Sequence, residues 1–163
     1  MIEADSFAER PLIGALLRMP VDAIRRRMLD DLHAAGFTDL VPAHFDVLLR
    51  YPGPDGRRPS DVAAEVGMSR QAVNYLLGQL EHLGYLVRRD DADDKRSRRI
   101  ELTERGQAVR RTIRATMTAI ETDLDRELGR TDFARLRQLL VTLNGSMIVR
   151  EFRKSASERN AGA

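Results

Sequence analysis

The chain has 163 residues, of which 42% are hydrophobic and 32% are charged, a balance typical of a soluble globular protein. It contains no cysteine, which excludes disulfides and thiolate metal sites, and no apolar run approaches the ~20 residues of a membrane span. The formal net charge is only +2, so bulk charge does not indicate nucleic acid, and any such inference depends on where basic residues cluster.

The first predicted element is a long helix within residues 11–36. Its apolar residues recur at helical spacing: Leu12, Leu16, Leu17, Val21, Ile24, Met28 and Leu32. Pro20 interrupts this pattern, and we expect a kink or a restarted helix there, because proline lacks the N–H and clashes with the preceding turn. Gly36 is placed to end the helix.

Residues 40–103 are predicted to form a compact core that begins with a short helix and a loop. Pro42 suits a first helical turn, and Phe45 and Leu48 form part of an apolar stripe. The segment "YPGPDGRRP", residues 51–59, is dense in proline and glycine and predicts a loop.

Two helices separated by a tight turn at Gly67 follow. Ser60 and Ser69 stand where the two helices would begin, and a serine side chain there accepts a hydrogen bond from the first turn. The second helix carries an apolar stripe: Val73, Leu76, Leu77, Leu80 and Leu83. This layout is that of a helix-turn-helix.

A charged run, "RRDDADDKRSRR" (residues 88–99), lies between two short apolar segments. The segments "YLVRR" and "RRIELT" are predicted to pair as antiparallel strands, with the charged run at the tip of the hairpin. A hairpin directly after the second helix makes the motif a winged one. The predicted fold class is therefore mainly α with a small β-hairpin wing.

Residues 104–153 predict two further helices. Thr103 is placed to cap the first, and Thr131 the second, which is predicted to continue as one helix to Phe152. Residues 154–163 are polar and predict a frayed tail.

The face of the second core helix opposite its leucines is polar. Gln71 and Asn74 carry amides that bond bidentately to adenine, and Arg70 suits guanine or phosphate. The Ser69 hydroxyl and the helix N-terminus suit a phosphate. Tyr75 lies beside this face, where it would pack or touch the sugar-phosphate. The alternative is that this polar face is an ordinary solvated helix surface. The hairpin that follows and its arginines favour DNA binding over this alternative.

Residues 60–106 resemble the winged helix-turn-helix core of MarR-type transcriptional regulators. The strongest part is "DADDKRSRRIELTERG", because the family has a wing of the form D-x-D-D-x-R followed by a strand ending in L-T-x-x-G. The matching positions are Asp91, Asp93, Asp94, Arg96, Leu102, Thr103 and Gly106. Family wings often have proline where this chain has Ala92.

The resemblance implies a homodimer whose subunits pair through the helices of residues 11–36 and 104–153. It further implies that Arg96 enters a minor groove and that the Asp94 carboxylate orients it. A narrow minor groove attracts arginine through its enhanced negative potential. Basic residues around the tip would offset the acidic ones near phosphate: Arg88, Arg89, Lys95, Arg98 and Arg99.

The resemblance also implies a small-molecule pocket between the dimer helices and the core, with DNA released by an anionic or phenolic compound. Near where such a pocket would form lie His33, Phe37, His44 and Phe45. The histidine spacing fits no metal motif, and no catalytic triad order, P-loop or dinucleotide fingerprint appears. We therefore predict no metal, no cofactor and no enzymatic activity.

The sequence as a whole predicts a cytoplasmic, homodimeric, sequence-specific DNA-binding regulator that acts as a ligand-responsive repressor. Its partner would be a double-stranded, pseudo-palindromic operator with half-sites ~10 bp apart, and no membrane. The alternative is a winged-helix protein-interaction module that does not bind DNA. Salt distinguishes the two, because phosphate contacts make DNA affinity fall steeply with ionic strength.

Overall fold

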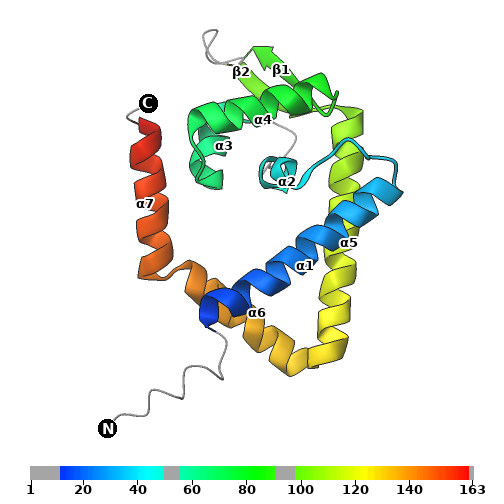
Figure 1. The fold of residues 1–163 in the computed structure, drawn as a ribbon, viewed down its shortest axis with the longest axis vertical. Coiled ribbons are helices and arrows are strands. Elements are labelled where there is room, and N and C mark those ends of the chain that lie inside the picture. Colours follow the sequence, from blue (N-terminus) through cyan, green and yellow to red (C-terminus); the bar gives the residue numbers. More distant parts are fainter. Residues whose placement is uncertain (1–11, 50–55, 91–97, 162–163) are drawn as a thin grey trace.

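The computed structural model describes residues 12–49, 56–90 and 98–161, which form seven helices and a two-stranded hairpin (Figure 1). In chain order these are α1 (Ile13–Ala34), α2 (Pro42–Leu49), α3 (Pro59–Val66), α4 (Arg70–His82), β1 (Leu86–Asp90), β2 (Arg98–Leu102), α5 (Glu104–Leu128), α6 (Arg130–Asn144) and α7 (Met147–Ala161). The predicted fold class, mainly α with a β-hairpin wing, is confirmed.

The winged core lies at one end of the molecule, and the terminal helices, α1, α5, α6 and α7, extend from it (Figure 1). Helices α2, α3 and α4 gather with the hairpin at one end. From there α5 leads away along one side, α6 crosses the opposite end, and α7 returns toward α3. Helix α1 packs along α5. None of the described helices has the length and apolar character that a bilayer crossing requires.

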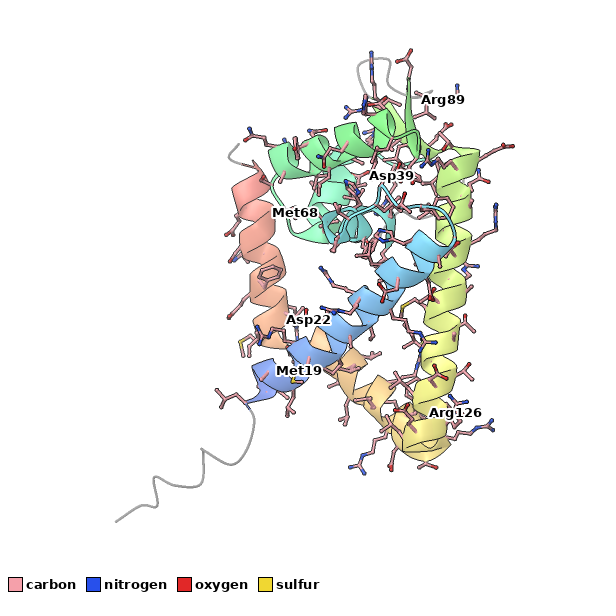
Figure 2. All side chains as sticks on the ribbon, turned by 45° about the vertical axis from the view of Figure 1, so that its right-hand side comes forward. Met19, Asp22, Asp39, Met68, Arg89 and Arg126 are labelled. Atoms are coloured by element: carbon pink, nitrogen blue, oxygen red, sulfur yellow. The ribbon has the colours of Figure 1, made fainter. Side chains whose placement is uncertain are left out.

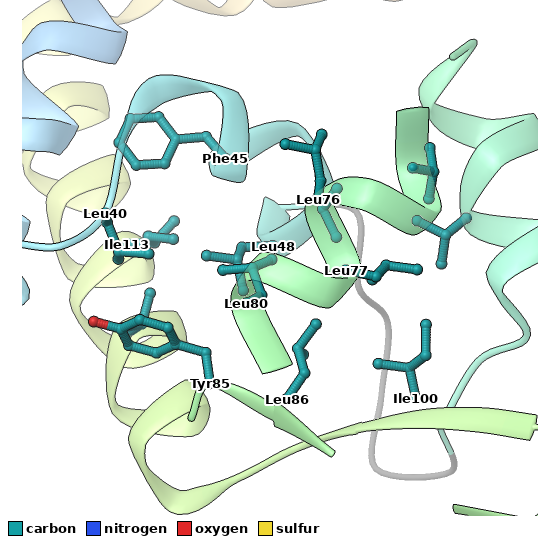
Figure 3. Packing of buried hydrophobic residues seen from close by; sticks show 14 of the residues in the cluster. Leu40, Phe45, Leu48, Leu76, Leu77, Leu80, Tyr85, Leu86, Ile100 and Ile113 are labelled. Carbon is teal, nitrogen blue, oxygen red and sulfur yellow. The ribbon is translucent and has the colours of Figure 1, made fainter. Parts of the chain in front are cut away.

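A single hydrophobic cluster fills the space between the core helices, the hairpin and the first half of α5. Figure 3 shows Phe45 of α2, Leu80 of α4, Tyr85 before β1 and Ile113 of α5 directed toward one another. Phe45, Leu80 and Tyr85 are fully buried. The apolar stripes predicted for α2 and α4 therefore meet in this cluster.

The two serines predicted as helix caps differ in the structure. The Ser69 hydroxyl oxygen accepts a hydrogen bond from the Ala72 N–H at 3.1 Å, which confirms its capping role at α4. The Ser60 prediction was wrong, because α3 begins one residue earlier, at Pro59, with Arg58 at the cap position and no side-chain cap. Proline favours a first helical position because its φ is already helical and its missing N–H is not needed there.

The hairpin is antiparallel, with Leu86 opposite Leu102, and it gains a third backbone partner. The Arg57 N–H donates to the Ile100 carbonyl at 3.1 Å, and the Ile100 N–H donates to the Arg57 carbonyl at 2.8 Å. At the adjacent Gly56, φ is +66°, and a Cβ there would lie 3.1 Å from the Ile100 oxygen. The loop before α3 is thus attached to β2, which the sequence pattern did not predict.

The charged run of residues 88–99 is divided between the strands and the tip. Arg88, Arg89 and Asp90 belong to β1, and Arg98 and Arg99 belong to β2. The predicted strands "YLVRR" and "RRIELT" are confirmed, whereas the prediction that the charged run forms the tip was wrong for its two ends. Its ends extend the strand pairing because each strand residue there still has a cross-strand partner, such as Asp90 opposite Arg98.

Helix α1 is continuous through Pro20, so the predicted restart does not occur. One missing hydrogen bond leaves the other turns intact, and the later turns are held by the buried side chains of Met28 and Leu32.

The C-terminal helices correct three further predictions. Helix α6 begins at Arg130 with Gly129 at the cap position and no side-chain cap, so the prediction that Thr131 caps it was wrong. The last helix is not single, because α6 ends at Asn144 and α7 begins at Met147. Residues 154–161, predicted as a frayed tail, continue α7. Lys154 and Glu158 lie 3.9 Å apart one helical turn from each other, a spacing that supports an exposed helix.

Candidate nucleic-acid interface

Helix α4 directs its polar face away from the core. Val73 and Leu80 are fully buried on one side, whereas Arg70, Gln71 and Asn74 are exposed on the other. Residues three and four apart share a helix face, so the three polar side chains form one surface near the N-terminus of α4. We refer to this surface as the reading face.

Two more predicted residues border the reading face. Ser69 is exposed and uses its hydroxyl oxygen to cap α4, which leaves the hydroxyl proton for an outside acceptor. Tyr75 is 67% exposed, and its hydroxyl oxygen accepts a hydrogen bond from the Gln79 side-chain amide at 3.1 Å. Its own hydroxyl proton is likewise directed to an acceptor other than Gln79.

Three of the described wing arginines lie close to a carboxylate. Arg88 donates to Glu81 of α4 at 3.0 Å, and this contact joins β1 to the C-terminal end of α4. Arg89 donates to Glu101 at 2.8 Å, a pair at the hairpin end of the molecule, where Figure 2 labels Arg89. The Arg98 guanidinium is 3.9 Å from Asp90.

Arg96 is predicted to enter the minor groove, Asp94 to orient it, and Lys95 to offset acidic charge near phosphate. Asp94, Lys95 and Arg96 fall outside the residues that the structure describes. Their roles stay predictions.

A groove of about 580 Å³ opens between the start of α2 and the side of α4. Its lining comprises Asp39, Val41, His44, Asn74, Tyr75, Gly78, Gln79, His82 and Leu83, and we call it the α2–α4 groove. Asn74 of the reading face and the neighbouring Tyr75 both line it. Anything bound in this groove would therefore contact residues expected to meet DNA.

Of the four residues predicted near an effector pocket, His44 lines the α2–α4 groove and the other three do not. Phe45 is buried in the core. Phe37 packs edge-on against the Tyr85 ring, with ring centroids 6.2 Å apart. The His33 Nε2 lies 3.1 Å from the Leu40 carbonyl oxygen.

A polar cluster that the sequence pattern did not reveal joins three separate elements. Asp39 precedes α2, Tyr85 precedes β1, and Arg105 lies in the first turn of α5. Tyr85 donates its hydroxyl proton to Asp39, while Arg105 donates to Asp39 at 2.8 Å and to the Tyr85 oxygen at 3.0 Å. The Arg105 guanidinium also lies 4.5 Å from the centre of the Tyr85 ring, within cation–π range.

The environment of this cluster shifts two pKa values in opposite directions. Burial, followed by the hydrogen bond to Asp39, raises the pKa of Tyr85 to about 12. Burial by itself would raise the pKa of Asp39, but hydrogen bonds from Tyr85 and its own backbone, together with Arg105, outweigh it and lower that pKa. The cluster therefore holds a neutral tyrosine beside an ionised carboxylate over the ordinary pH range.

Gly106 allows α5 to begin directly against this cluster. A Cβ at this position would lie 2.1 Å from the Tyr85 carbonyl oxygen, a distance that no side chain tolerates. The preceding Thr103 caps α5 through the Gly106 N–H at 3.1 Å and donates its hydroxyl proton to the Gly84 carbonyl at 2.6 Å. The L-T-x-x-G pattern thus has a packing role at the base of the wing.

Within the described part of the chain, no three or more His, Asp or Glu side chains gather in a way that would hold a metal ion.

These features define a winged helix-turn-helix protein with long helices on either side of the core. Residues 35–97, from the position after α1 to the position before β2, match the model of the MarR family. Among curated proteins, no sequence matches the chain.

Solved structures match over most of the chain. The transcriptional repressor CouR bound to a 23-mer DNA duplex is 28% identical, with 88% of this chain and 98% of CouR covered and a TM-score of 0.67. CouR from Rhodococcus jostii RHA1 bound to p-coumaroyl-CoA is 25% identical, with 80% and 90% covered and a TM-score of 0.64. FabT from Streptococcus pneumoniae in complex with DNA is 20% identical, with 82% and 93% covered and a TM-score of 0.71, which shows a common fold. The predicted resemblance to MarR-type winged helix-turn-helix regulators is confirmed.

Proposed function

We propose that this chain is a homodimeric, sequence-specific DNA-binding transcriptional regulator and that it acts as a ligand-responsive repressor. The observation that carries the proposal is the reading face, where Arg70, Gln71 and Asn74 are exposed together near the start of α4. The arginine-bearing hairpin that follows α4 would provide a second contact with the DNA. The similarity to CouR, which is bound to a DNA duplex in its solved structure, supports the same role.

The reading face suits a major groove. In a helix-turn-helix the N-terminal residues of the second helix meet the base edges. Asn74 and Gln71 would pair with adenine through both the acceptor and the donor of their amides. Arg70 would take guanine or a phosphate, and Ser69 and Tyr75 would donate hydroxyl protons to backbone phosphates.

The wing arginines can exchange their carboxylate partners for phosphates at little cost. Exposed ion pairs such as Arg89–Glu101 and Arg98–Asp90 contribute about 0–1 kcal/mol each. Arg88 is only 25% exposed and would act mainly by fixing the wing against α4. Beyond the described residues, we propose Arg96 as the minor-groove contact, with Asp94 orienting it and Lys95 adding attraction to phosphate.

A second copy of the chain is the proposed occupant of the apolar surface on the terminal helices. Most of the large exposed apolar side chains lie there: Leu12, Ile13, Leu16, Leu17, Met19 and Val21 in and before α1, Leu128 of α5, Leu136, Leu139, Leu140, Val141 and Leu143 of α6, and Met147, Ile148 and Phe152 of α7. An apolar surface of this extent marks an association site. A two-fold pair would present two reading faces to half-sites ~10 bp apart.

The proposed effector is a small anionic or phenolic compound bound between the terminal helices and the core, near His33, Phe37, His44 and Phe45. The similarity to CouR, solved with p-coumaroyl-CoA, supports a ligand-responsive regulator. A ligand that reached the α2–α4 groove beside His44 would contact Asn74 and Tyr75 and so oppose DNA directly. The proposed role is regulatory rather than enzymatic, and its proposed place is the cytoplasm.

Selection of bound sequences from a random duplex pool tests the proposal. We expect enrichment of a two-fold symmetric motif whose affinity falls by orders of magnitude between ~50 and ~200 mM salt. If no duplex is enriched, or if affinity does not respond to salt, the protein-interaction module is favoured instead.

Single substitutions then separate the proposed contact of the reading face with the major groove from that of the wing with the minor groove. Arg96→Ala should weaken binding by about 1–3 kcal/mol, whereas Asn74→Ala or Gln71→Ala should change the preferred base at one position. Arg126→Ala is the control, because Arg126 is exposed at the end of the molecule far from the wing (Figure 2). Unchanged affinity in Arg96→Ala would show that the wing assignment is wrong.

A further inference from the structure

A chain of hydrogen bonds connects the backbone before α2 with Tyr75 beside the reading face. The Val41 N–H donates to Nδ1 of His44 at 3.3 Å. Nε2 of His44 lies 3.3 Å from the side-chain oxygen of Gln79, and the Gln79 amide donates to the Tyr75 hydroxyl at 3.1 Å. All four residues line the α2–α4 groove.

The Val41 N–H, at one end of this series of hydrogen bonds, determines which of the other groups donate and which accept. The Val41 N–H can only donate, so Nδ1 of His44 is unprotonated and the proton of the neutral imidazole lies on Nε2. Nε2–H then donates to the Gln79 oxygen, which turns the Gln79 amide toward Tyr75. As a result, the Tyr75 hydroxyl proton is left to point at an acceptor outside the protein, such as a phosphate oxygen.

Because His44 is buried, water cannot take its place as a hydrogen-bond partner in this series. Its side chain is 3% exposed, whereas Tyr75 is 67% exposed. A buried polar group without its partner destabilises the structure that holds it. The position of the exposed tyrosine therefore depends on a histidine inside the core.

We propose that His44 is a positioning residue for DNA binding, and that its protonation releases Gln79 and Tyr75 and weakens binding at low pH. This inference rests on the proposed function. A protonated imidazole carries N–H groups on both nitrogens, so Nδ1–H would face the Val41 N–H, donor against donor.

The charged and titratable groups around His44 do not neutralise an added proton. In the groove, the Asp39 carboxylate is already held by Tyr85 and Arg105. His82 is exposed on α4 and would add charge of the same sign when protonated. On α1, His33 contacts the Leu40 carbonyl. The phenol of Tyr75 completes the set that lines the groove.

The first test measures affinity for the selected duplex at fixed ionic strength. Between a neutral and an acidic buffer, wild-type affinity should fall about five- to tenfold when His44 becomes protonated, the equivalent of one or two hydrogen bonds. His44→Gln keeps an amide donor near the Nε2 position but cannot titrate, so it should bind like wild type at the higher pH and show no pH response. Gln79→Leu should bind weakly at both pH values.

His82→Gln is the matched control, because His82 lines the same groove outside the hydrogen-bond chain, and it should keep the wild-type pH profile. Three results would overturn the inference: a flat wild-type profile, affinity that rises on acidification, or an unchanged profile in His44→Gln. A rise would show that protonated histidines contact phosphate instead.

A second test needs no DNA and so separates this inference from the proposed function. Nitrogen NMR of the histidine rings should show His44 protonated at Nε2 and not at Nδ1 in the neutral form. Tyrosine fluorescence, taken as the difference between wild type and Tyr75→Phe, should titrate with His44 and lose that step in His44→Gln. The opposite tautomer, or a step that persists in His44→Gln, would refute the relay even if the duplex is bound.

Discussion

The winged core and the terminal helices contain similar apolar stripes but bury them very differently within one protomer. Phe45, Val73 and Tyr85 of the core are fully buried. Helix α6 has no buried residue, and Ile148 of α7 is 78% exposed. Figure 2 labels Met19 on α1, away from the wing end of the molecule, and this side chain is 69% exposed.

This difference indicates two sources of stability. The core is held by contacts inside the protomer, where each buried apolar side chain contributes about 1.5–3 kcal/mol. Helices α6 and α7 have the same type of stripe, but in the protomer much of it is exposed, so in the proposed dimer their stability would depend on a second copy. Changes in the core should therefore unfold the protomer, and changes in the terminal helices should separate the subunits.

The largest expected effect comes from a pair of phenylalanines. Phe45→Ala should lower the free energy of unfolding by about 3–5 kcal/mol, because Phe45 is fully buried. Phe152→Ala, at a side chain that is 58% exposed, should cost less than about 1 kcal/mol in the protomer. Urea unfolding at low protein concentration measures both. Equal losses would remove the distinction between the two regions.

A charge on α6 should act on association instead. Leu139→Glu places a carboxylate on a side chain that is 58% exposed in the protomer, and in a dimer seam it should weaken association by about 3 kcal/mol, or ~100-fold. Sedimentation over a range of concentrations measures the shift. Gln138→Glu adds the same charge at the neighbouring position as a control. A dimer unaffected by Leu139→Glu would place the interface on another surface.

Alkaline pH should weaken the core through Tyr85. Because its pKa is raised to about 12, the folded protein keeps the phenol proton that the unfolded chain loses near pH 10. That contribution to stability is fully present below about pH 10 and is lost as pH rises toward about 12, a change of about 2–3 kcal/mol. Urea unfolding of wild type and Tyr85→Phe over this range isolates it, with Tyr75→Phe as the control. An identical pH dependence in Tyr85→Phe would contradict the assignment.

The smallest effect concerns the caps of the two core helices. Ser69→Ala should cost about 1 kcal/mol, because the Ala72 N–H loses its partner. Ser60→Ala should stay within about 0.5 kcal/mol, because Ser60 does not cap α3. Thermal unfolding of the two variants gives the comparison. A larger loss in Ser60→Ala would mean that α3 begins differently in solution.

Local patterns in the sequence predicted most of the elements and much of the candidate interface. The caps at Ser69 and Thr103 and the two wing strands were confirmed, since each depends on residues within a few positions of one another. The exposed side of α4 was also predictable, because its apolar stripe leaves Arg70, Gln71 and Asn74 on the other side. The breaks and extensions at the C-terminus were missed, since a polar helix and a frayed tail have the same composition.

The contacts that join distant segments were not predictable. Asp39, Tyr85 and Arg105 are separated by long stretches of chain, and no periodicity relates them. The same is true of the Arg57–Ile100 bridge and of the bond between His44 and Gln79. Each needs two surfaces to meet at a distance and angle that only the packed core supplies.

The sequence by itself determined the order of helices and strands, the polar face of α4 and the wing motif, because hydrophobic periodicity and capping act over a few residues. The tertiary structure decided which apolar stripes are buried within the protomer and which are left exposed, since the sequence pattern of a stripe is the same in either case. It also decided that the reading face borders a groove and is linked through Gln79 to a buried histidine. Such links arise where separate helices pack, and packing depends on the whole fold.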